Sequence, residues 1–295
     1  MPPLRRAYME LHLAVLLFGF TAILGNLIQL SALVLVWWRV LITVISLFLF
    51  VRPVQLLREI PIRHLFQMMG IGLLVALHWL TFYGAIKLSN ASVALVAMAT
   101  TSFFTSLVEP LVMRQRIKWL ELGTGFLIVP GMVLVVRSTE GQMFEGLIVG
   151  LVSAFFVALF GTLNKKQVAN YDPISITFVE LGCSLVLLSL ILPFSGMVSA
   201  EAVHYLPPSW RDWGYLLALA LICTTLGYIL ALRSLRHLSA FASNLTISLE
   251  PVYGIILAYI LLREDRELGE HFYWGCLIIL AAVFSYPFIK RHFYN

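Results

Sequence analysis

Ten long apolar stretches, separated by short polar segments, run along this chain of 295 residues. A helix that crosses the hydrocarbon layer of a membrane needs about 20 mostly apolar residues, because each adds about 1.5 Å and the layer is about 30 Å thick. The alternation of apolar and polar positions that is typical of an outer-membrane barrel does not occur. The pattern therefore predicts an all-α polytopic membrane protein. We expect its ten transmembrane helices at 8–28, 32–51, 64–86, 90–113, 119–137, 145–165, 173–195, 210–233, 240–263 and 270–290.

Composition agrees with this pattern and leaves little room for anything else. Hydrophobic residues make up 60% of the chain and charged residues 12%, whereas soluble domains average roughly 45–50% and 25%. The longest connections, at 52–63 and 196–209, are too short for a soluble domain, so binding is expected within the membrane layer. Arg5 and Arg6 precede the first apolar stretch, which continues to Ile28 without a small-residue cleavage pattern. It is interpreted as a retained span and not a signal peptide.

The basic residues are distributed unevenly over the connections. With a cytoplasmic N-terminus, the inner segments hold 14 of the 20 Lys and Arg residues and the outer segments hold five, namely Lys87, Arg137, Arg211, Arg263 and Arg266. This bias follows the positive-inside rule and predicts that both termini are cytoplasmic, in a multi-pass protein of the cytoplasmic (inner) membrane. The net charge of +5 is then explained by the basic residues that concentrate on the cytoplasmic connections. It does not indicate nucleic-acid binding, which needs a folded basic module.

Similar segments recur in the two halves of the chain. Residues 91–94 resemble 239–242, and residues 37–40 align with 178–181, so that Arg39 corresponds to Glu180. A unit of five spans points the opposite way when it is repeated, because five is odd. We therefore predict an inverted repeat of two five-helix bundles, 1–140 and 141–295, an architecture typical of secondary transporters with a site near the midplane. A coincidental likeness among apolar helices is the alternative.

Several of these segments resemble a known family. They are Phe18-Gly19, Arg39 in the second span, the stretch 76–87 (ALHWLTFYGAIK), and Leu249-Glu250-Pro251 followed by 261–264. Together they resemble the EamA family of the drug/metabolite transporter superfamily, whose ten-helix members include aromatic amino-acid exporters. The resemblance covers essentially the whole chain. It implies that helices one to four and six to nine surround a central cavity, with helices five and ten at the periphery, in an exporter or, less often, an importer of small metabolites.

Three charged residues lie inside predicted spans. A charge in hydrocarbon is unfavourable by roughly 2.5–3.5 kcal/mol on insertion scales, so such residues normally face a protein interior or a water-filled path. Arg39 has a planar fork of donors that suits a carboxylate or phosphate; a structural ion pair with Glu180 or Glu250 is the alternative. Glu180 is a candidate for ion coupling or for a substrate amine, or else a structural hydrogen-bonding group. Glu250 precedes Pro251, which kinks a helix, so it marks a site or only a hinge.

Aromatic and histidine side chains supply further candidates. His78 lies at about the depth of Arg39 and suits a proton switch, although a lone His more often bonds a neighbour. Trp79 and Tyr83 are expected to wall a ligand cavity, and Trp38 to stack on an aromatic or cationic substrate. The alternative for tryptophan is a place in the interfacial belt of the membrane.

Neutral polar residues complete the predicted site. Thr101, Tyr228 and Asn244 are candidates for hydrogen bonds to a ligand, although such groups commonly serve helix packing instead. Glu109 replaces the apolar or small residue that the family usually carries; it is interpreted as an interfacial group near Arg114 and Arg116.

The function that these features favour is gradient-driven transport. The expected substrate is a small organic metabolite such as an amino acid, protons are a candidate for the coupled ion, and a monomer or weak homodimer in the lipid bilayer is expected. No cofactor or metal is expected, because the three cysteines match no metal-ligand spacing and no nucleotide-binding glycine loop occurs. The alternatives are an intramembrane enzyme, for which the His-Glu-x-x-His and Gly-x-Ser-x-Gly motifs are missing, and a channel, for which no filter is recognisable.

Overall fold

The computed structural model describes residues 3–138, 141–194, 204–247, 249–262 and 269–293. Within these ranges the regular structure is helical and contains no strand, which confirms the all-α prediction. Seven helices among them are long and apolar enough to cross a membrane. Three shorter apolar helices, at 32–47, 119–135 and 270–282, occupy other predicted spans. That all ten cross the membrane, and that both termini are cytoplasmic, remain predictions.

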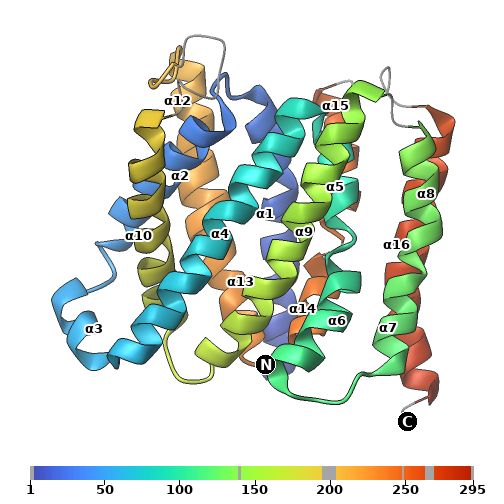
Figure 1. Cartoon of the computed structure of the whole chain (residues 1–295), viewed down its shortest axis with the longest axis horizontal. Helices are drawn as coiled ribbons and strands as arrows, with labels where there is room; N and C mark the ends of the chain where they lie inside the picture. Colours follow the sequence, from blue (N-terminus) through green and yellow to red (C-terminus); the bar gives the residue numbers. More distant parts are fainter. Residues whose placement is uncertain (1–2, 139–140, 195–203, 248, 263–268, 294–295) are drawn as a thin grey trace.

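The helices stand side by side in one elongated bundle (Figure 1). Those of the first half are α1 (Pro3–Leu27), α2 (Ala32–Leu47), α3 (Pro53–Glu59), α4 (Ile62–Leu88), α5 (Ala91–Met98), α6 (Thr101–Met113), α7 (Trp119–Phe126) and α8 (Ile128–Ser138). Those of the second half are α9 (Gly141–Gln167), α10 (Pro173–Ile191), the short η1 (Leu192–Phe194), α12 (Trp210–Leu217), η2 (Ala218–Leu226), α13 (Gly227–Leu235), α14 (Ala240–Ile247), α15 (Glu250–Leu261) and α16 (Glu270–Phe293).

Two predicted spans are each interrupted near the middle of the bundle. α5 ends at Met98 and α6 begins at Thr101, although the chain has neither Pro nor Gly at this break. α14 ends at Ile247 and α15 begins at Glu250, with Pro251 at its second position. Proline lacks an N–H group and suits the first turn of a helix, so its position accounts for the start of α15.

A third span changes its winding without a break. The segment η2 between α12 and α13 is a π-helix of nine residues. The hydroxyls of Thr224 and Thr225 donate hydrogen bonds to the carbonyl oxygens five residues earlier, of Leu219 at 2.7 Å and of Ala220 at 3.0 Å. π-Turns within α-helices occur frequently at functional sites. The residues that face η2 are therefore candidates for a functional site.

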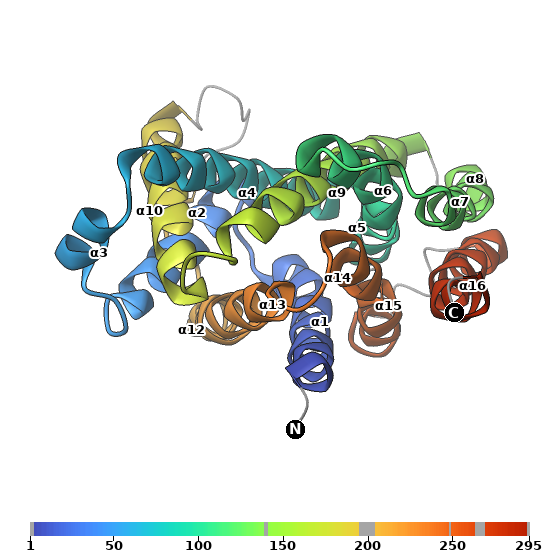
Figure 2. The same ribbon diagram turned by 90° about the horizontal axis from the view of Figure 1, so that it is seen from below.

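α7, α8 and α16 lie together at one end of the bundle in both views (Figures 1 and 2). α8 and α16 approach closely at a pair of glycines: a Cβ atom on Gly131 would lie 2.7 Å from the carbonyl oxygen of Gly275. The remaining helices form the larger part of the bundle. The resemblance places the fifth and tenth spans at this same periphery.

α4 packs against α10 at another close approach. Gly72 of α4 lies against the backbone of Glu180, and Ser184 donates a hydrogen bond to the carbonyl oxygen of Gly72 at 2.7 Å. The absence of a side chain at Gly72 is what allows this separation. The contact sets the position of Glu180 behind the cavity described below.

Candidate functional site

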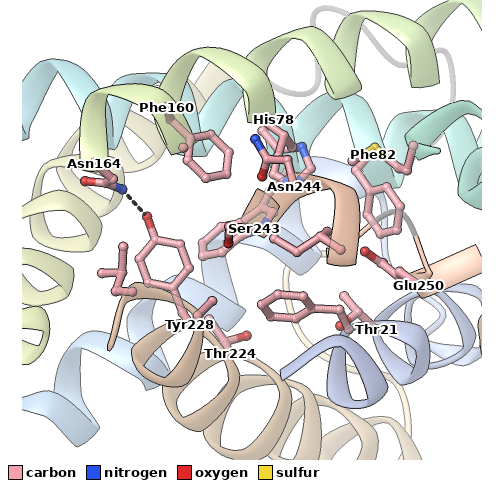
Figure 3. A pocket seen from close by; sticks show the side chains of 18 of the residues that line it. Thr21, His78, Phe82, Phe160, Asn164, Thr224, Tyr228, Ser243, Asn244 and Glu250 are labelled. Carbon is pink, nitrogen blue, oxygen red and sulfur yellow. Dashed lines mark hydrogen bonds between the residues drawn. The ribbon is translucent and has the colours of Figure 1, made fainter. Parts of the chain in front are cut away.

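A cavity lies in the larger part of the bundle, among α1, α2, α4, α5, α9, η2, α13, α14 and α15 (Figure 3). The space inside it is about 810 Å³, part of which is open to solvent. Most of its wall is apolar, and the rings of Phe18, Phe82 and Phe160 contribute to it. Ligand pockets for small molecules combine such a wall with a few polar groups.

Arg39 is the basic residue on the described cavity wall, and neutral groups hold it. Its side chain is buried, with the residue 2% exposed. Nε donates to the Thr224 hydroxyl at 2.5 Å, and Nη1 donates to the Tyr83 hydroxyl at 2.7 Å. The guanidinium carbon lies 4.0 Å from the ring centroid of Trp79, in a cation–π contact. These contacts fix the guanidinium, and within the described ranges no opposite charge is in contact with it.

Glu250 lines the same cavity from the start of α15. It and Arg39 interact electrostatically across the cavity. Nevertheless, no carboxylate lies within 4.0 Å of Arg39 among the residues that the structure describes. The alternative interpretation of Arg39, a structural ion pair with Glu180 or Glu250, is therefore not what the structure has: the hydroxyl groups of Thr224 and Tyr83 take those contacts.

Glu180 belongs to a buried cluster beside the cavity. Its Oε2 accepts hydrogen bonds from the hydroxyl of Tyr228 at 2.6 Å and from Nδ2 of Asn164 at 3.3 Å. Nδ2 of Asn164 also donates to the Tyr228 hydroxyl at 3.2 Å, the bond drawn in Figure 3. Tyr228 and Asn164 line the cavity, whereas Glu180 lies behind them. The carboxyl group is thus separated from the cavity by its own two partners.

His78 is oriented by Ser153 of α9. The Ser153 hydroxyl donates to the carbonyl oxygen of His78 at 2.9 Å and lies 2.7 Å from its Nδ1. A hydroxyl has one hydrogen, so the second contact assigns a hydrogen to Nδ1, which donates to Ser153. In a neutral imidazole Nε2 is then an acceptor. The ring also contacts Phe82 and Phe160 on the cavity wall.

The structure brings six of the ten predicted site residues to the cavity wall: Arg39, His78, Trp79, Tyr228, Asn244 and Glu250. Asn244 donates to the Thr105 hydroxyl at 2.9 Å. Their meeting agrees with the prediction of a cavity shared by the two halves.

The other four do not line the cavity. Tyr83 lies behind Arg39 as its hydrogen-bond acceptor, and Glu180 lies behind Tyr228. Thr101 is buried at the start of α6. Trp38 points elsewhere: its Nε1 donates to the carbonyl oxygen of Tyr205 at 2.7 Å, and its ring meets that of Trp213.

Two functional candidates escaped the sequence analysis. Asn164 directly precedes Lys165 and Lys166, which is the pattern expected at the end of a membrane span. Nevertheless, Asn164 is fully buried. Ser153 lies within an apolar stretch, where a single hydroxyl is unremarkable. A signal for Asn164 does exist, since a carboxamide inside a predicted span requires partners.

The sequence analysis interpreted Glu109 as an interfacial group near Arg114 and Arg116. The structure shows that this interpretation is wrong. It is 5% exposed, and its carboxylate accepts hydrogen bonds from the backbone N–H groups of Ala240 at 3.2 Å and Phe241 at 2.6 Å. The first N–H groups of a helix have no partner within it, and a negative charge there is favourable. Glu109 therefore caps α14 and connects the two halves of the chain.

Apolar helices of spanning length around a buried cavity with few polar groups define a polytopic membrane protein of the transporter type. Comparison with known sequences gives the family. The pattern of the EamA-like transporter family matches residues 6–137 and again 144–286, so the chain belongs to this family. The resemblance noted from the sequence motifs is thereby confirmed.

Individual relatives are distant. An uncharacterized transporter of Bacillus subtilis, YxxF, is 21% identical over 226 residues, which are 75% of this chain and 69% of the relative. Adenosine 3'-phospho 5'-phosphosulfate transporter 2 of Caenorhabditis elegans is 25% identical over 210 residues, 66% of this chain and 56% of its own length. A solved crystal structure superimposes with a TM-score of 0.69 at 12% identity, covering 98% of this chain and 99% of the other, and supports the fold alone.

Proposed function

We propose that the protein is a secondary transporter that exports a small zwitterionic metabolite, such as an amino acid, by alternating access. The observation that carries this proposal is the separation of two opposite charges on one cavity wall. Arg39 and Glu250 both face the cavity, yet they form no ion pair with each other. A ligand that carries a carboxylate and an ammonium group supplies a partner to each.

Arg39 retains donors for such a ligand. A guanidinium has five N–H groups, and two of them are used on Thr224 and Tyr83. The remaining donors suit the two oxygens of a carboxylate, and a bidentate pair is both strong and specific in orientation. Because Thr224 and Tyr83 hold the guanidinium in place, little conformational entropy is lost when the ligand binds.

The apolar wall accounts for the rest of the ligand. Phe18, Phe82, Phe160 and Trp79 offer aromatic surface to an apolar side chain. The carboxyl group of Glu250 on the same wall favours a zwitterion over a multiply charged anion of the kind in the name of the nematode relative.

The two halves of the chain supply the moving parts in this proposal. The family pattern matches the chain twice, which supports an inverted repeat of the bundles 1–140 and 141–295. In such transporters one repeat rocks against the other around a fixed site, and gradients supply the driving force. The export direction rests on the resemblance to exporters.

The test is counterflow of radiolabelled amino acids in proteoliposomes that contain the purified protein. Wild-type protein is expected to show saturable counterflow. Arg39→Lys keeps the charge but loses the planar fork, so the apparent affinity should fall roughly 10- to 100-fold, the equivalent of about 1–3 kcal/mol for a bidentate contact. The matched control, Arg58→Lys at an exposed position of α3, should behave as wild type. Near wild-type transport by Arg39→Lys would refute the anchor role, and unsaturable flux would indicate a channel.

A further inference from the structure

The buried cluster of Glu180, Asn164 and Tyr228 has two oxygen atoms without a hydrogen-bond donor. Glu180 and Asn164 are both 0% exposed. In the part of the chain that the structure describes, Oε1 of Glu180 and Oδ1 of Asn164 have no hydrogen-bond partner, although the two side chains are joined through Oε2 and Nδ2. A buried acceptor without a donor is unfavourable, and two in one cluster point to a missing donor.

Among the residues that the structure describes, no cation contacts Glu180. From α13 its neighbour is the neutral hydroxyl of Tyr228, and from α4 it is the backbone of Gly72. The one charged residue of α2, Arg39, is bonded to hydroxyl groups elsewhere. Unlike Glu250, Glu180 is fully buried and does not line the cavity. A carboxylate cut off from water and without a paired cation is strongly disfavoured, and such a group neutralises itself instead.

The titratable side chains of α4 lie apart from Glu180: Arg63 is exposed, and Tyr83 bonds Arg39. His78 faces Ser153, His64 bonds the hydroxyl of Tyr171, and Lys87 donates to the carbonyl oxygen of Ile28 at 2.8 Å. None of these contacts involves Glu180. Among the described residues, no neighbouring side chain therefore supplies the missing donor.

We propose that Oε1 of Glu180 binds a proton, which donates to Oδ1 of Asn164, and that this is the ion-coupling site of the transporter. One hydrogen satisfies both unpartnered oxygens at once. Together with the existing bond from Nδ2 to Oε2, it completes a cyclic pair between a carboxylic acid and an amide. The proton-binding part of the proposal stands alone; the coupling part rests on the proposed transport function.

Tyr228 links this site to the cavity. Its ring and hydroxyl lie on the cavity wall, and the same hydroxyl donates to Glu180. Its single hydrogen serves either Glu180 or an acceptor on a ligand, but not both. Ligand binding therefore changes the hydrogen bonds of Glu180 and with them its affinity for a proton, and by linkage the protonation of Glu180 changes the affinity for the ligand.

The first test detects the proton and needs no substrate. Infrared spectra of the full-length protein in lipid bilayers are recorded for wild type, Glu180→Gln and the control Glu59→Gln, whose residue is exposed on α3. We expect a carboxylic-acid C=O band at neutral pH that Glu180→Gln loses and Glu59→Gln keeps. Tyr228→Phe should shift this band, because Oε2 loses a donor. Identical bands in wild type and Glu180→Gln would overturn the proposal, as would loss of the wild-type band on exchange of choline for Na⁺, which would make the site a sodium site.

The second test measures coupling in proteoliposomes. A pH gradient across the membrane should alter the accumulation of radiolabelled amino acids by wild type, whereas Glu180→Gln should retain counterflow and lose the response to pH. A response of normal size in Glu180→Gln would refute the coupling role. The two proposals fail separately: absence of counterflow in wild type rejects the substrate class while the infrared band still decides the proton site, and absence of the band with normal counterflow rejects the proton site alone.

Discussion

The contact of α4 with α10 makes a prediction whose size follows from the structure. A Cβ atom on Gly72 would overlap the carbonyl oxygen of Glu180 and lie 3.0 Å from its Cα. These are backbone atoms, which cannot rotate away, so Gly72→Ala must push the two helices apart. The substitution also weakens the hydrogen bond from Ser184 to the carbonyl of Gly72. Both effects act on the contact that holds Glu180 in place.

We expect Gly72→Ala to lower the free energy of unfolding by about 2–4 kcal/mol. Overpacking of a core contributes about 1–3 kcal/mol, and a hydrogen bond between membrane helices about 0.6 to 1.7 kcal/mol. The unfolding equilibrium then changes by roughly 30- to 700-fold. Reversible unfolding in bicelles measures this directly.

Two control substitutions separate packing from helix propensity. Gly70 lies two residues away on α4 and Gly182 lies on α10, and neither position has an atom within 4 Å of an added Cβ. Gly70→Ala and Gly182→Ala should leave stability unchanged or raise it by up to about 1 kcal/mol. If Gly72→Ala were as stable as these controls, the close approach of α4 and α10 would be refuted.

Two further predictions concern polar contacts between helices. Glu109→Ala removes the acceptor for the N–H groups of Ala240 and Phe241, so it should lower the free energy of unfolding by about 0.5–2 kcal/mol, with partial recovery in Glu109→Gln; equal stability of the alanine variant and wild type in the same unfolding assay would contradict the capping role. Ser153→Ala frees Nδ1 of His78, so nitrogen NMR of labelled histidine should show one neutral tautomer in wild type and a mixture in the variant. A mixture already present in wild type would disprove the assigned hydrogen bond.

Those parts of the fold could be predicted that depend on the type of individual residues. Long apolar stretches predicted the helices, and Pro251 predicted the interruption of the span that contains α14 and α15. The break between α5 and α6 had no such signal, because Ala99 and Thr100 are compatible with a helix. The π-helix η2 was equally invisible, since Ala218–Leu226 contains neither Pro nor Gly to mark a change of winding.

The sequence predicted several residues of the candidate site but not the contacts that these residues make. A charged side chain exposed to lipid is so unfavourable that Arg39 and Glu250 were expected to face the protein interior or a water-filled path. Both line the same cavity. The partners were harder to foresee. Electrostatics alone favoured a carboxylate beside Arg39, whereas the structure supplies the hydroxyls of Tyr83 and Thr224 from two other helices. Such partners come from distant parts of the chain, and only the packing of helices determines them.

The π-helix also has a consequence for comparing this chain with others. A π-turn takes up an extra residue without lengthening a loop, so a related protein with an ordinary α-helix at 218–226 would be shorter by a residue inside a membrane span. Insertions and deletions are usually placed in loops. An alignment that forbids gaps inside helices would therefore shift every position of α13 by one and set the wrong residue opposite Tyr228, even where the two structures coincide.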